Sequence, residues 1–273
     1  LHESFVEISQ TREDTEDEKE TLEEKRTDQL ELRRIQELQK KTIENQEAEL
    51  KNLLKVTKGQ EKVYQQILAD KEKSAAAIRT ALFSLTGAGA IPFEKAYQYA
   101  SEAGSKTGIR PAFILGIIAE ESNLGENVGK GNWRVDMHPT RDQPAFAQIV
   151  AKLGLNPDDL PVSKKAWYGW GGAMGPAQFI PSTWVLYEDK IANMVGHPPN
   201  PWDPRDAFFA AAILLKDNGG ARGTREAERL AALRYLAGWK NATKPSYAFY
   251  GNEVMDLADK YQQQIDILKG SGS

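Results

Sequence analysis

The chain has 273 residues, no cysteine, and 35 Lys and Arg against 39 Asp and Glu, which gives a formal net charge of −4. The absence of cysteine excludes disulfide scaffolds, thiolate nucleophiles and cysteine-bound zinc. The slightly acidic balance argues against a dedicated nucleic-acid-binding protein, so we expect no nucleic-acid partner. No uncharged apolar run approaches the roughly 20 residues that a membrane-spanning helix needs.

Residues 1–86 are predicted to form a helical arm. The first 63 residues contain no proline, a single glycine (Gly59) and a single aromatic (Phe5), so they cannot supply a globular core. Apolar residues then recur at steps of three and four, which is the spacing of a coiled-coil seam. The seam consists of Leu53, Val56, Val63, Ile67, Ile78 and Leu82.

The seam needs a partner helix, which would come from the chain's own upstream segment, a second copy, or a membrane-anchored division or envelope complex. Gly59 marks either a kink in this helix or the turn of a helical hairpin. The alternative to an arm that docks on a partner is a spacer helix surrounded by solvent.

Residues 87–269 read as a second, wholly helical domain, followed by a flexible tail at 270–273. Helix starts are indicated at Pro111, before Trp184, at Asp203 and at Thr224. Helix stops are indicated at Gly108, Gly125, Gly196, Gly219 and Gly238. No convincing run of alternating strand residues occurs, so the predicted fold class is all-α.

Glu121 is the candidate catalytic residue. On a helical wheel of residues 111–122, Phe113, Ile114, Ile117 and Ile118 share a face with it. Burial on an apolar face and the negative end of the helix both disfavour a charged carboxylate, so we expect a raised pKa at Glu121. A carboxylic acid that stays protonated near neutral pH can act as the general acid in cleavage of a glycosidic bond. A partly exposed glutamate capping a core helix is the alternative.

The pair Glu121–Ser122 and the segment Gly172–Pro181, which reads GAMGPAQFIP, resemble the lytic transglycosylases of bacterial cell walls. Those enzymes have a lysozyme-like helical domain, and the resemblance covers about residues 92–250. Their third motif, A-Y-N-x-G, is matched only in part by residues 234–238, because Leu236 stands where the asparagine is expected.

The resemblance implies roles for individual residues. Glu121 would be the sole catalytic acid and base, while Ser122 would orient it or the acetamido group of the sugar. Gln178 and the backbone near Met174 would hold the glycan, and Tyr235 would form a hydrogen bond close to Glu121. Trp170 and Trp239 flank the motifs and are candidates for sugar stacking. Ser122 as a local backbone contact and Met174 and Tyr235 as core residues are the structural alternatives.

The implied reaction cleaves the MurNAc–GlcNAc β-1,4 bond of peptidoglycan and leaves 1,6-anhydromuramyl ends. It needs no cofactor and no metal, and no HExxH pattern is present. A muramidase that admits water, and a non-catalytic glycan-binding scaffold, are the alternatives. We expect an exported protein at the periplasmic or extracellular face of the cell wall, whose export signal lies outside this sequence.

Overall fold

A computed structural model of the chain describes residues 33, 37, 40, 91–166 and 169–269. Contacts divide the chain into two units, 1–46 with 167–169 and 47–166 with 170–273, and all the labelled helices belong to the second unit. Arg33, Glu37 and Lys40 are helical, as predicted for the arm. The predicted seam from Leu53 to Leu82, and Gly59 with it, lies outside the described residues.

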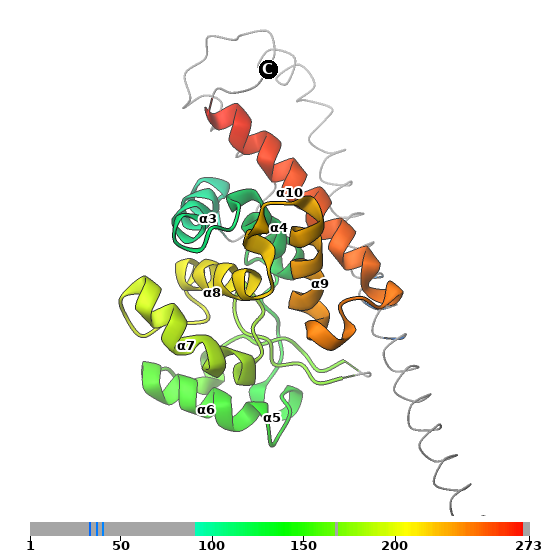
Figure 1. Cartoon of the computed structure of the whole chain (residues 1–273). Helices are drawn as coiled ribbons and strands as arrows, with labels where there is room; N and C mark the ends of the chain where they lie inside the picture. Colours follow the sequence, from blue (N-terminus) through cyan, green and yellow to red (C-terminus); the bar gives the residue numbers. More distant parts are fainter. Residues whose placement is uncertain (1–32, 34–36, 38–39, 41–90, 167–168, 270–273) are drawn as a thin grey trace, which may run out of the picture. The chain divides into compact units, whose positions relative to one another are not determined.

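The second unit is a packed set of helices, as the all-α prediction requires (Figure 1). The longer helices are α3 (Phe93–Thr107), α4 (Pro111–Ser122), α6 (Asp142–Leu153), α7 (Pro181–Val195), α8 (Pro204–Asp217), α9 (Arg225–Asn241) and α10 (Ala248–Lys269). Short elements are α5 (Trp133–Asp136) and the 3₁₀ turns η1 (Pro157–Asp159), η2 (Gly220–Arg222) and η3 (Pro245–Tyr247). The sequence pattern had not indicated α5 or α6 as separate helices.

Helix α4 is the centre of this unit. It packs against α3, α8 and α10, and every residue from Ala112 to Ile118 is buried. A Cβ added at Gly116 would lie 2.8 Å from the carbonyl oxygen of Val254, so the glycine allows α10 to approach α4 closely. The four apolar residues predicted to share a face with Glu121 are buried, and so are Ala112, Leu115 and Gly116, so burial is not confined to one face of the helix. Pro111 at the start of α4 and Ala119, Glu120 and Glu121 in its last turn are partly exposed.

Most of the predicted helix ends are confirmed. Pro111 and Pro204 are in the first turns of their helices, and the side chains of Asp203 and Thr224 accept hydrogen bonds from backbone N–H groups at 3.1 and 3.2 Å. The predicted stop at Gly125 was two residues late. Asn123 takes the left-handed conformation that ends α4, with φ of 50°.

Gly238 was expected just beyond the end of a helix, and the regular part of α9 does end there. Helix α9 continues to Asn241, but Gly238 inside it has φ of 70° and ψ of 174°, so the helix is broken there. Only glycine adopts this backbone region without strain.

Extended backbone is confined to a few isolated bridges among the described residues. Val162 pairs antiparallel with Met174, which in turn pairs with Phe179. The segments 162–165 and 171–174 therefore lie side by side and lead directly into the turn at 175–178. None of the described helices has the length and apolar character that would let it cross a membrane.

Candidate active site

The last turn of α4 is tied to the glycine-rich turn through Ser122. Its side chain is 1% exposed, and its hydroxyl donates to the carbonyl oxygens of Pro176 at 2.7 Å and Ile118 at 3.2 Å. The same hydroxyl accepts the N–H of Gly125 at 2.9 Å. One buried hydroxyl thus joins three backbone groups and sets where Glu121 stands relative to the turn.

The turn at residues 175–178 is shaped by close packing. Gly175 has φ of 62°, and a Cβ added to it would lie 1.8 Å from the carbonyl oxygen of Pro201. Gln178 also has a positive φ, 51°, and its Nε2 donates to the carbonyl oxygen of Gly175 at 2.8 Å. The turn is therefore held in one conformation by the Gln178 side chain and by the packing of Gly175 against Pro201, in the segment that precedes α8.

Two tyrosines from α9 and α10 complete the surroundings of Glu121. The hydroxyl of Tyr250 donates to Oε1 of Glu121, and that of Tyr235 donates to the carbonyl oxygen of Ala177 at 2.6 Å. Burial, and then the negative charge of Glu121, raise the pKa of both tyrosines well above the usual value of 10. Glu120 also raises the pKa of Tyr250 through its charge. Both hydroxyls therefore keep their protons and remain donors.

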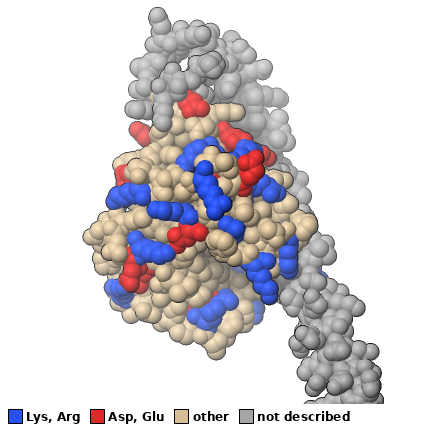
Figure 2. Space-filling view, in the orientation of Figure 1, with Lys and Arg blue, Asp and Glu red and all other residues tan. Residues whose placement is uncertain are grey.

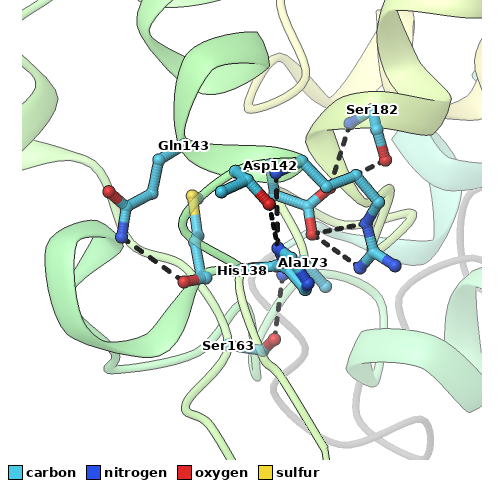
Figure 3. Close-up of polar contacts among 9 residues, drawn as sticks. His138, Asp142, Gln143, Ser163, Ala173 and Ser182 are labelled. Carbon is cyan, nitrogen blue, oxygen red and sulfur yellow. Dashed lines mark hydrogen bonds and ion pairs between the residues drawn. The ribbon is translucent and has the colours of Figure 1, made fainter.

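Polar contacts join α6 to α7 and join the two paired segments to each other (Figure 3). Asp142 is fully buried, and its carboxylate accepts from the Ser182 hydroxyl at 2.7 Å and the Arg141 guanidinium at 2.7 Å. Ser163 Oγ accepts the N–H of Ala173 at 2.9 Å, beside Met174. The Asp142–Ser182 bond holds the start of α7 to the start of α6, and the Ser163–Ala173 bond holds the glycine-rich segment to the extended segment beside it.

Both candidate stacking tryptophans are exposed, and both have a cation on the ring. Trp170 is 41% exposed, with Nζ of Lys165 3.6 Å from a ring centroid and the His138 ring at 5.4 Å. Trp239 is 64% exposed, with the Arg234 guanidinium 3.7 Å from a ring centroid.

The structure brings four of the predicted residues together at the end of α4: Glu121, Ser122, Gln178 and Tyr235. Met174 is 1% exposed, so its side chain belongs to the core and only its backbone, whose N–H donates to Phe179 O at 2.9 Å, adjoins the turn. The Ser122 hydroxyl bonds backbone groups, as in the structural alternative in which this residue makes a local backbone contact. Tyr235 donates to the Ala177 carbonyl oxygen in the turn beside Glu121, and the hydrogen bond to Glu121 itself comes from Tyr250.

Tyr250 is the functional residue that the sequence pattern missed. It belongs to no motif, and it stands 129 positions after Glu121 in the chain. The one available signal was a tyrosine at the start of a helix with an apolar stripe, which is common in helix cores. Its role became visible only through the packing of α10 on α4.

A hollow of about 280 Å³ lies beside the turn and is separate from this group. It is apolar and is lined by Ile91, Gly125, Val128, Leu160, Pro161, Gly175, Pro176, Trp202 and Pro204. None of Glu121, Gln178, Tyr235 or Tyr250 lines it.

The described domain has a balanced surface charge and no cluster of metal-binding side chains among its described residues. Residues 91–269 contain equal numbers of acidic and basic side chains, and both signs are interspersed on the face in Figure 2. Within the described part of the chain, no group of three or more His, Asp or Glu side chains is arranged to hold a metal ion.

Comparison with known proteins adds a family. A family model described as a transglycosylase SLT domain matches residues 30–266 and so begins inside the predicted arm. Among solved structures, the soluble lytic transglycosylase SltB1 from Pseudomonas aeruginosa is 17% identical with a TM-score of 0.47, over 70% of this chain and 81% of that one. The Escherichia coli lytic transglycosylase Slt35 in complex with bulgecin A is 16% identical with a TM-score of 0.44, over 73% and 83%. The comparison with curated proteins gave no match.

Proposed function

Because the chain belongs to the transglycosylase SLT domain family, we propose that it is a peptidoglycan lytic transglycosylase with Glu121 as its single catalytic acid and base. The observation that supports this most directly is the Tyr250–Glu121 hydrogen bond at the exposed end of an otherwise buried helix. It fixes the orientation of one carboxyl group next to the turn formed by the signature segment.

The proposed chemistry follows from one positioned carboxyl group. Glu121 donates its proton to the oxygen that links MurNAc to GlcNAc, and the C1–O bond breaks through an oxocarbenium-like state. The ionised Glu121 then takes the proton from the C6 hydroxyl of the same MurNAc as that oxygen bonds to C1. The product is a 1,6-anhydromuramyl end, and no water is consumed. Tyr250 stays a neutral donor throughout, because its pKa is raised.

The substrate contacts are proposed as follows. The glycan strand lies along the turn at 175–178, held by Gln178 and by the backbone near Met174, with Tyr235 at the edge of the site. Trp170 and Trp239 supply exposed rings to which sugars can stack. Ser122 acts by holding the end of α4 to this turn, since its hydroxyl already bonds three backbone groups.

The test is digestion of purified peptidoglycan by Glu121→Gln, with Glu120→Gln as the matched control one position away. Amide and acid have the same shape, so we expect the Glu121 variant to lose cleavage while binding and folding persist, and the control to stay close to wild type. More than a few per cent of residual activity in Glu121→Gln would show that another group is the acid.

Mass spectrometry of the products separates the proposal from its alternatives. Anhydromuramyl products are one water lighter than hydrolytic ones, so reducing muramyl ends would indicate a muramidase. Binding of sacculi without any soluble product from the wild-type protein would indicate a glycan-binding scaffold.

We propose further that residues 87–269 form the catalytic domain and residues 1–86 a coiled-coil arm that positions or restrains it. Action on peptidoglycan requires export to the periplasmic or extracellular face of the wall, where a membrane-anchored envelope complex is one source of the arm's partner helix. Removing residues 1–80 distinguishes the roles of the arm: restraint predicts faster digestion of isolated sacculi, and a passive spacer predicts an unchanged rate.

A further inference from the structure

Trp239 is the most exposed aromatic ring among the described residues, and it is held in a fixed orientation. Its Nε1–H donates to Oδ1 of Asn218 at 3.1 Å, and Asn218 is 2% exposed. The indole's only hydrogen-bond donor is therefore used inside the protein. What remains at the surface is apolar ring, 64% exposed, and leaving such area in water is unfavourable by about 25 cal/mol per Å².

Arg234 covers one face of this ring. Its guanidinium lies 3.7 Å from a ring centroid, and its Nη1 donates to the carbonyl oxygen of Asn218 at 2.6 Å. Asn218 therefore anchors both the indole and the cation that stacks on it. Because one face is covered, the exposed area of Trp239 belongs mainly to the opposite face and the ring edges.

The backbone turns Trp239 away from the regular helix. Gly238 has φ of 70° and ψ of 174° inside α9, a conformation that only glycine adopts readily. A Cβ added at Gly238 would meet nothing within 4 Å, so packing does not require the glycine. The backbone conformation of Gly238 is what requires a glycine, and it changes the direction of the chain immediately before Trp239.

The place of the ring on α9 indicates its ligand. Tyr235 lies four residues earlier, in the part of α9 before the break at Gly238, and donates to Ala177 in the turn next to Glu121. The turn contacts α9 at Tyr235 through this bond and through the Phe179 ring, whose centroid lies 6.0 Å from that of Tyr235, so a strand bound across the turn would reach α9 at this point. Sugar rings present a flat face of C–H groups, and rigid aromatic faces with few polar groups are typical of ligand sites.

We propose that the open face of Trp239 is a glycan subsite, which stacks on one N-acetylhexosamine ring of the strand held at Glu121. Asn218 and Arg234 are its positioning residues, and Gly238 supplies the turn that presents the ring. Pre-orientation lowers the ordering cost of binding, so the subsite contributes affinity. This inference rests on the proposed function.

The test is co-sedimentation of the full-length Glu121→Gln protein with insoluble peptidoglycan sacculi, with and without Trp239→Ala. We expect the Trp239 change to weaken binding about tenfold, and Gly238→Ala to weaken it comparably by redirecting the ring. Leu186→Ala is the matched control, because Leu186 is 76% exposed on α7 and its loss removes similar apolar surface. Thermal melts fix a temperature at which every variant is folded for the binding assay, because Trp239→Ala removes the donor to the buried Asn218.

A second readout uses the protein with Glu121 intact. Trp239→Ala should raise KM for sacculi about tenfold with kcat nearly unchanged, because it removes binding away from the reacting bond. Binding and KM within twofold of the parent would overturn the subsite, whereas a wild-type protein that releases no soluble product from sacculi would overturn the proposed function instead.

Discussion

Replacing Ser122 by alanine tests how the end of α4 is held. The hydroxyl is 1% exposed and bonds to Pro176, Ile118 and Gly125. Alanine fits the space but leaves the Pro176 carbonyl and the Gly125 N–H without this partner. The Ile118 carbonyl loses less, since it also accepts the N–H of Leu124 at 3.4 Å.

The magnitude follows from those two backbone groups. An unsatisfied buried donor or acceptor costs about 1–3 kcal/mol. Because the Gly125 N–H is only partly buried and adds about 1 kcal/mol, Ser122→Ala should lower the free energy of unfolding by roughly 2–4 kcal/mol. For a domain of this size, 1 kcal/mol shifts Tm by about 2–4 °C, so Tm should fall by about 4–16 °C. Activity at a temperature where the variant stays folded should fall through kcat, because Glu121 is no longer held in register with the turn.

The measurement is thermal unfolding together with kcat and KM on soluble glycan substrate. Ser105→Ala is the control, because the Ser105 hydroxyl also bonds a backbone carbonyl, at 2.7 Å, but is exposed. Its effect should stay within about 0.5 kcal/mol. An unchanged Tm for Ser122→Ala with a raised KM would refute the reasoning and show that Ser122 contacts the sugar.

Three further outcomes are expected. Tyr250→Phe should keep the fold and lower kcat more than it raises KM, because it removes the donor to Glu121; an unchanged kcat would contradict a positioning role. The free energy of unfolding should fall as pH rises above about 10. The reason is that the unfolded chain releases tyrosine protons that Tyr235 and Tyr250 keep in the folded state, where their pKa is raised. Denaturant titrations at pH 9 and 11 should show a smaller fall in this free energy for Tyr235→Phe than for the wild type. Gly175→Ala should unfold or inactivate the protein, because its Cβ would lie 1.8 Å from Pro201 O; a wild-type melt and rate would disprove that packing.

Local signals along the chain determined the fold class and most helix ends. Proline has no N–H to lose in a first helical turn, and Asp203 and Thr224 supply oxygens to unpaired backbone donors. These effects act within four residues, so they can be read without knowledge of the tertiary structure. The candidate acid was visible for the same reason, because Glu121 and the apolar residues before it lie on one helix.

Tertiary structure decided the rest, because it depends on which distant segments meet. All-round burial of α4 follows from its position between α3, α8 and α10, and one helical wheel cannot show that. Tyr250 reaches Glu121 because α10 packs on α4 at Gly116. Trp239 is oriented by Asn218, from the end of α8. Such contacts join residues that are 21 to 129 positions apart, and only the folded chain brings them within hydrogen-bond distance.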